Sequence, residues 1–226
     1  MSTKIYAHRG SMGKYPQNTM LAFTKGLEEG AVGIETDVQL TADGGLVLLH
    51  DEDLSHTTTG TGMVKDHTLA DLQALTTGGH PIPTLQNLLN HIKDHDIALN
   101  LELKTALVAY DGIESAVLNA VRAANPRGKV IYSSFHLPTL LRIKALEPTA
   151  HVAFLLAQHI SHPSDYLATL GLEALHIDKD IVLQYPQHYA PLADKIRVWT
   201  VNEPDEIATF KTMGVAAIMT DFPERG

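Results

Sequence analysis

The stretch Val32-Gly-Ile-Glu-Thr-Asp-Val38 begins as an apolar, β-branched run, but two carboxylates, Glu35 and Asp37, interrupt it. On a strand, residues two apart point to the same face, so these carboxylates project side by side and the alternate residues face the other way. Burying like charges without partners costs several kcal/mol for each ion. A cationic partner is therefore expected, and a hard metal ion with oxygen ligands is the simplest candidate.

Outward from this stretch, short apolar runs with strand character alternate with helical patterns along the chain. Eight strands are expected, at residues 4–8, 32–38, 97–104, 129–132, 151–155, 173–177, 195–200 and 216–220. Helical patterns follow all but the last, at residues 18–30, 84–93, 112–124, 137–146, 163–170, 181–189 and 204–213.

This alternation is typical of a parallel sheet, and eight such units predict an α/β fold, a closed TIM (β/α)₈ barrel. An open doubly wound sheet is the alternative, which strand counting alone separates poorly. After the second strand, a short apolar run ends at His50-Asp51, and the polar, turn-rich residues 52–83 are expected to be an excursion from the main fold.

Composition limits the function classes. The chain has 226 residues, no cysteine and a formal net charge of −9, and 44% of its residues are hydrophobic. The negative charge argues against a nucleic-acid partner. The sequence shows neither a secretory signal at its start nor a run long enough for a membrane span, so we expect a cytoplasmic protein.

Three carboxylates suit a metal ion. Glu35, Asp37 and Glu102 lie on neighbouring expected strands, and barrel enzymes gather their sites at the C-terminal strand ends. Oxygen ligands without cysteine indicate Mg²⁺ or Ca²⁺. A set of surface salt bridges is the alternative, and it is favoured for any one carboxylate taken alone.

Two histidines flank these carboxylates in the expected fold. His8 ends the first strand and His50 the run after the second, so they offer a general base and a general acid on opposite sides of a reacting group. A lone histidine at a strand end is more often structural. Because the chain has 13 histidines, chance pairing is a real alternative.

Four further residues are candidates for substrate contact. Arg9 offers a planar fork of donors for phosphate oxygens, and Lys104 offers a point charge that is also placed for an ion pair with Glu102. Trp199, the only tryptophan, follows the seventh strand together with Asn202, where its ring suits the carbon part of a small ligand.

An ordered set of motifs resembles the glycerophosphodiester phosphodiesterase family in its short bacterial form. The set comprises His8-Arg9-Gly10, Pro16-Gln-Asn-Thr19, Glu35-Thr-Asp37, Thr41-Ala-Asp-Gly44, His50-Asp51, Thr57-Thr-Thr-Gly60, Glu102-Leu-Lys104, Ser134-Phe135, Trp199-Thr-Val-Asn202 and Thr220-Asp-Phe-Pro223. His-Arg-Gly alone is weak evidence, whereas this ordered set spans the chain nearly end to end.

The resemblance implies a TIM barrel domain over residues 1–226, with 52–83 as a small insertion after strand 2. It implies hydrolysis of a small-molecule glycerophosphodiester to glycerol 3-phosphate and an alcohol. It also implies that Glu35, Asp37 and Glu102 are metal ligands and that His8 and His50 are catalytic. A homodimer stays open.

Two residues depart from the family pattern. Gln17 stands where the family usually has glutamate, and His56 stands where it favours arginine. The first is expected to retune a hydrogen bond near the metal or substrate, and the second to have a smaller effect on the insertion. Two alternative functions stay open: a related phosphodiesterase or lyase that releases a cyclic phosphate, and a non-catalytic phosphodiester-binding barrel.

Overall fold

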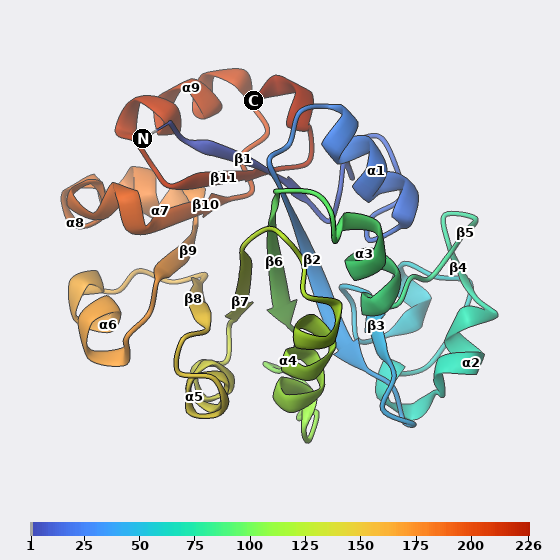
Figure 1. Ribbon diagram of the computed structural model, residues 1–226. Helices are drawn as coiled ribbons and strands as arrows, with labels where there is room; N and C mark the ends of the chain where they lie inside the picture. The colour runs from blue at the N-terminus through green and yellow to red at the C-terminus, as the bar shows by residue number, and fades with distance from the viewer. Residues whose placement is uncertain (1) are drawn as a thin grey trace.

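The eight expected strands form and close into a parallel barrel in the computed structural model, which describes residues 2–226 (Figure 1). They are β1 (Lys4–His8), β2 (Gly33–Leu40), β6 (Ala98–Leu103), β7 (Val130–Ser134), β8 (His151–Leu156), β9 (Ala174–Asp178), β10 (Ile196–Trp199) and β11 (Ala217–Thr220). The order β1-β11-β10-β9-β8-β7-β6-β2 closes because β2 also pairs with β1. The TIM barrel is confirmed, and the open sheet is excluded.

Helices cover the outside of the barrel (Figure 1). They are α1 (Met20–Glu28), α3 (Leu85–Ile92), α4 (Ile113–Ala124), α5 (Leu137–Leu146), α6 (Pro163–Leu170), α7 (Lys179–Gln184), α8 (Pro186–Tyr189) and α9 (Pro204–Met213), with 3-10 turns η3 (Ala190–Lys195) and η4 (Pro223–Arg225). None of the helices within residues 2–226 combines the length and apolarity of a membrane span.

The helix boundaries follow local chemistry. The Thr19 hydroxyl accepts a hydrogen bond from the Ala22 N–H at the start of α1, and Gly214 ends α9 with a left-handed backbone. The helical stretch expected near 181–189 is present and forms two short helices, α7 and α8. Pro186, which has no N–H to donate, begins the second of them.

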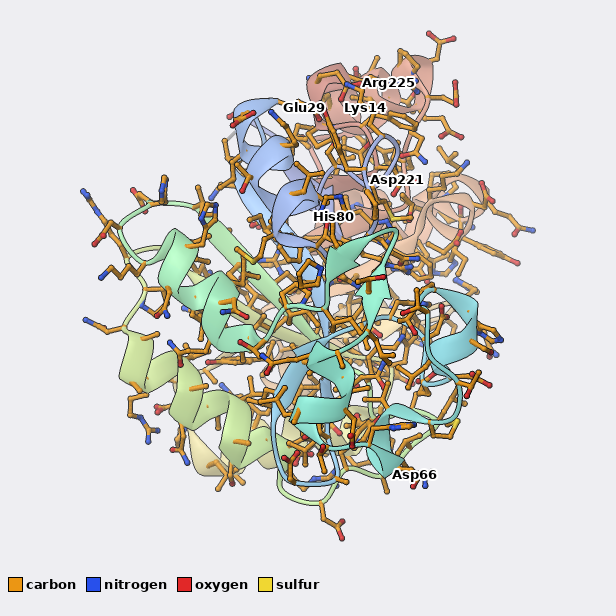
Figure 2. The ribbon with its side chains drawn as sticks, turned by 90° about the vertical axis from the view of Figure 1, so that its right-hand side faces the viewer. Lys14, Glu29, Asp66, His80, Asp221 and Arg225 are labelled. Carbon is orange, nitrogen blue, oxygen red and sulfur yellow. The ribbon has the colours of Figure 1, made fainter. Side chains whose placement is uncertain are left out.

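The excursion after β2 is a small structured unit (Figure 2). It begins with β3 (Leu46–Leu48), which pairs antiparallel with β2, and continues through η1 (Leu54–His56), η2 (Val64–Asp66), α2 (Leu69–Gln73), β4 (Thr76–Thr77) and β5 (His80–Pro81). Its apolar cluster contains Val47, Leu49, Leu54, Val64, Leu72 and Ile82. This insertion therefore packs on residues of its own, beside the barrel.

An ion-pair cluster on the surface links the segments on both sides of α1 to the C-terminal turn η4 (Figure 2). The Lys14 ammonium lies 3.0 Å from Glu29 at the end of α1 and 2.8 Å from Glu224 in η4. Exposed pairs of this kind contribute little free energy, about 0–1 kcal/mol each. Closure of the barrel depends instead on the pairing of β1 with both β2 and β11.

The interior of the barrel is filled by small side chains and one ring. Ala98, Ala153, Ala174 and Ala217 line the lumen with Ile131 and Met219, and the Tyr6 ring packs among them. On the neighbouring strands β9 and β10, the buried Arg197 donates a hydrogen bond to Nε2 of His176. Burial and the adjacent guanidinium hold the pKa of His176 well below its usual value, so this histidine stays neutral.

Gly33 is required where Tyr6 crosses the lumen. A Cβ at residue 33 would lie 2.5 Å from the Tyr6 ring, well inside van der Waals contact. Gly33→Ala should therefore lower the free energy of unfolding by about 1–3 kcal/mol, the usual cost of overpacking. Urea denaturation checks this. Val32→Ala is the matched control, because Val32 is 48% exposed, and it should change stability by no more than about 0.5 kcal/mol. An unchanged Gly33→Ala midpoint would contradict the packing argument.

Candidate active site

The strand register brings the three predicted carboxylates together. Asp37 on β2 lies opposite Glu102 on β6, and Glu35 lies two residues before Asp37 on the same face. Oxygen atoms of all three side chains lie within 4.8 Å of one another. Glu35 and Asp37 do not end β2, as the sequence suggested, because the strand continues to Leu40 to pair with β3.

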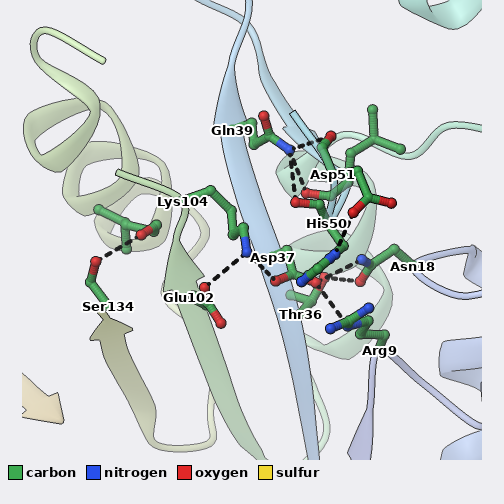
Figure 3. A network of polar contacts seen from close by, with 12 residues as sticks. Arg9, Asn18, Thr36, Asp37, Gln39, His50, Asp51, Glu102, Lys104 and Ser134 are labelled. Atoms are coloured by element: carbon green, nitrogen blue, oxygen red, sulfur yellow. Dashed lines mark hydrogen bonds and ion pairs between the residues drawn. The ribbon is translucent and has the colours of Figure 1, made fainter. Parts of the chain in front are cut away.

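Two basic side chains partly compensate these carboxylates (Figure 3). Nε of Arg9 lies 3.3 Å from Asp37 Oδ2, and the Lys104 ammonium lies 3.2 Å from Glu102 and 3.8 Å from Asp37. The ion pair expected between Lys104 and Glu102 is present. Arg9 therefore pairs with Asp37, and Lys104 pairs with Glu102 and, at a longer distance, with Asp37. Among residues 2–226, Glu35 instead accepts a hydrogen bond from the backbone N–H of Arg9 alone, at 3.0 Å.

The three carboxylates differ in their ease of ionisation. Burial and the charge of Asp37 raise the pKa of Glu35 well above its usual value, and the same causes raise the pKa of Glu102 to about 7. Burial opposes the charge on Asp37 as well, but Arg9 and Lys104 lower its pKa. The protein alone therefore stabilises one full negative charge here better than three.

The donor set fits a hard divalent cation. All three side chains offer oxygen, and Oδ1 of Asp37 is buried and accepts no hydrogen bond among the described residues. An orphaned buried acceptor is costly unless a ligand completes it. Mg²⁺ and Ca²⁺ prefer such oxygen ligands, and either would allow all three carboxylates to ionise together.

Two residues with left-handed backbones support this cluster. They are Arg9 and Asn18, with φ of 52° and 53°. The side-chain amide of Asn18 donates to Asp37 Oδ2 at 2.9 Å, and Nη1 of Arg9 donates to Gln17 Oε1 at 2.7 Å. Gln17 thus contacts Arg9, and as a neutral residue it leaves Asp37 as that guanidinium's single carboxylate partner in the described chain.

His8 is oriented by a carboxylate that the sequence did not assign. Nδ1 of His8 lies 2.7 Å from Asp221 Oδ1, and its Nε2 lies 3.9 Å from Glu35. Although burial opposes the charge on Asp221, its hydrogen bond to His8 lowers its pKa, so Asp221 is an acceptor and Nδ1 carries a hydrogen. The position of Asp221 directly after the last strand was the available signal.

Asn202 holds Asp221 in place. Its amide N–H donates to Asp221 Oδ2 at 2.7 Å, and its oxygen accepts the backbone N–H of Asp221 at 2.9 Å. Asn202 was predicted to bind substrate. In the structure its amide is engaged with Asp221, so it acts on His8 through that carboxylate.

His50, which follows β3, has an equivalent arrangement. Its Nδ1 lies 2.9 Å from Oδ1 of the adjacent Asp51, and the side-chain amide of Gln39 donates to the carbonyls of His50 and Asp51 (Figure 3). Tyr110 in turn donates to Gln39. Burial lowers the pKa of His50, so the imidazole is neutral at neutral pH. Gln39 lies in the middle of a strand, where sequence alone gave no signal for this role.

Six of the nine predicted site residues line one cavity of about 100 Å³ inside the barrel mouth, whereas Asp37, Lys104 and Asn202 do not line it. His8, Arg9, Glu35, His50, Glu102 and Trp199 all line it. The Trp199 ring meets Phe135 edge to face, with centroids 5.7 Å apart. Its indole N–H is buried and donates to no described residue. The two histidines therefore lie at the same cavity as the carboxylate cluster and an aromatic wall.

Comparison with known proteins agrees with this geometry. The sequence pattern of the Glycerophosphoryl diester phosphodiesterase family matches residues 8–225. A glycerophosphodiester phosphodiesterase of Bacillus altitudinis is 38% identical, over 99% of this chain and 96% of its own length. A protein of the same name from Caldanaerobacter subterraneus is 35% identical, with the same two coverages.

Solved structures agree as well. An Oleispira antarctica phosphodiesterase, determined in complex with the product sn-glycerol-3-phosphate, superposes with a TM-score of 0.90 at 27% identity, covering 99% of this chain and 95% of that one. A glycerophosphodiester phosphodiesterase from Thermotoga maritima superposes with a TM-score of 0.83 at 25% identity, with coverages of 99% and 96%.

Metal binding should depend on pH through Glu102. Its pKa is raised to about 7, so in the metal-free protein its contribution to stability falls as the pH rises from about 4.5 to about 7. A divalent cation needs the ionised form, so it should raise the melting temperature more at about pH 8 than at about pH 6. Thermal unfolding with Mg²⁺ or Ca²⁺ measures this, with KCl at equal ionic strength as the control.

Glu102→Gln tests the assignment. This variant should lose most of the metal-induced rise in melting temperature, because one oxygen ligand can no longer carry charge. It should also lose the difference between the two pH values. Equal rises in the variant and the wild type would contradict a role for Glu102 as a ligand.

Proposed function

The chain belongs to the glycerophosphoryl diester phosphodiesterase family, and we propose that it is a phosphoric diester hydrolase that cleaves glycerophosphodiesters to glycerol 3-phosphate and an alcohol. The observation that carries the proposal is the shared cavity. Glu35 and Glu102 line the same small space as the two histidines, and their oxygens and those of the buried Asp37 lie within 4.8 Å of one another. The product complex of the Oleispira antarctica phosphodiesterase supports a small-molecule substrate.

We propose that Glu35, Asp37 and Glu102 hold one divalent cation, Mg²⁺ or Ca²⁺. When bound, this ion would supply Lewis-acid stabilisation of the charge that develops on the phosphate oxygens. Arg9 adds a fixed positive charge beside the same carboxylates, and Gln17 orients its guanidinium with a neutral hydrogen bond. The site is thus positive toward an anionic diester although the whole chain has a net charge of −9.

The histidines supply the proton transfers in this proposal. Each holds its Nδ1–H toward a carboxylate, Asp221 for His8 and Asp51 for His50, which leaves each Nε2 free for the reacting groups. One Nε2 accepts the proton of the nucleophile, either the glycerol hydroxyl of the substrate or water. The other histidine, which is protonated at Nε2 as well when the substrate binds, donates that proton to the leaving alkoxide and becomes neutral.

Replacement of either histidine tests this mechanism. His8→Ala and His50→Ala should each lower kcat by at least ~10²-fold, the low end for general acid–base catalysis. His95→Ala should leave kcat unchanged, because His95 is exposed in the loop before β6. Turnover of glycerophosphocholine gives the measurement, and near-normal kcat in either of the first two variants would refute the assignment.

Metal removal tests the cofactor. Treatment with EDTA should abolish hydrolysis, and excess Mg²⁺ or Ca²⁺ should restore it, because without the ion no Lewis acid stabilises the charge that develops on the phosphate oxygens. Phosphorus NMR of the reaction identifies the product. Glycerol 3-phosphate supports hydrolysis, whereas an accumulating cyclic phosphate indicates the lyase alternative. Full turnover in the presence of EDTA would refute the metal dependence.

A further inference from the structure

A second, larger groove opens directly beside the catalytic cavity. It has a volume of about 580 Å³, and both spaces are lined by His50, Glu102 and Phe135. A diester whose phosphate lies at the inner cavity therefore has one alcohol that extends into this groove past His50. The inner cavity, at about 100 Å³, is too small to enclose both alcohols of a diester.

The groove walls are mostly apolar. Met63 from the insertion, Leu103 at the end of β6, and Leu107 and Val108 in the loop after β6 line it together with the Phe135 ring. Leu107 is 82% exposed, an unusual position for a large apolar side chain. A wall of this kind suits carbon-rich groups better than polyhydroxylated ones.

One carboxylate in the groove has no partner. Asp51 pairs with His50, and Asp53 accepts the backbone N–H and the hydroxyl of Ser55. Glu52, between them, makes no side-chain hydrogen bond or ion pair among residues 2–226, although its backbone carbonyl is fixed by the Val64 N–H at 2.9 Å. The basic side chain that also lines the groove, Lys104, is already paired with Glu102 and Asp37.

Glu52 shares the groove with one aromatic ring, Phe135, and with the apolar walls. Its carboxylate also acts on a neighbour outside the groove lining: burial raises the pKa of Tyr110, and the Glu52 charge raises it further. A groove that combines an unpaired anion, an aromatic ring and apolar walls suits an alkylammonium group.

We propose that this groove binds the leaving alcohol of the substrate and that Glu52 selects diesters whose alcohol carries an ammonium group, such as choline or ethanolamine. The proposal rests on the proposed function and adds to it the class of alcohol. Glu52 contacts the ammonium group and takes no part in bond cleavage. It acts as a specificity residue, so its removal changes discrimination between substrates and leaves the chemical step intact.

A pair of substrates of equal shape tests the proposal in the wild-type protein. Glycerophosphocholine and glycerophospho-3,3-dimethylbutanol differ only in a quaternary nitrogen replaced by carbon. The wild type should hydrolyse the choline diester with a kcat/KM about fivefold higher or more, the upper range for one solvent-exposed ion pair. Equal values for the two diesters would overturn the proposal.

Substitutions then locate the preference. Glu52→Gln should remove it by lowering kcat/KM for the choline diester about fivefold, with the value for the neutral diester unchanged. Asp96→Asn is the matched control, because it removes the same charge from an exposed loop before β6, at the opposite end of the barrel, and should keep the preference.

Two outcomes separate this proposal from the proposed function. If Glu52→Gln lowers both diesters equally, or retains the preference, Glu52 does not select the alcohol and the inference is overturned while the hydrolase activity stands. If the metal-loaded wild type hydrolyses neither diester, the proposed function fails, and the inference fails with it.

Discussion

The site depends on one electrostatic constraint: three carboxylates, Glu35, Asp37 and Glu102, face the lumen of the barrel with their oxygens within 4.8 Å. Water cannot solvate them there, so ionisation of all three requires compensating positive charge. Arg9 and Lys104 provide enough positive charge to keep Asp37 ionised. The raised pKa values of Glu35 and Glu102 show that the same two cations do not fully compensate these glutamates. The proposed divalent cation would supply the missing positive charge, because the three side chains offer the oxygen ligands that such an ion prefers.

The surrounding structure fixes the atoms that would act on a substrate. Asp221 and Asp51 hold the two histidines by Nδ1, and a further side chain supports each segment, Asn202 for Asp221 and Gln39 for His50 and Asp51. Side chains on β2 and directly after β10 and β11 therefore set the imidazole orientations, which favours proton transfer at a defined position. The loop after β6 and the insertion form the adjoining groove.

Much of this arrangement was predictable from local sequence. Alternating strand and helix patterns gave the barrel, and the two-residue spacing of Glu35 and Asp37 gave their common face, because side-chain direction on a strand has a fixed period. Residue chemistry then indicated an oxygen-ligand metal site, and the ordered motifs indicated the family. These conclusions need only short-range geometry, and so does the division of the helical stretch near 181–189 into two short helices at Pro186.

Tertiary structure alone decided which distant residues share a hydrogen bond. Asp221 lies 213 residues from His8, and they meet only because β1 and β11 are neighbours in the closed barrel. Through-space distance also decides the contacts of Gln39 with the His50 segment and the lack of a side-chain partner for Glu52 among residues 2–226. Burial and nearby charge decide the shift of the Glu102 pKa. The sequence by itself determined the fold class and the candidate chemistry of residues 32–51, whereas the register between strands determined the charge balance, because electrostatic energy depends on separation in space.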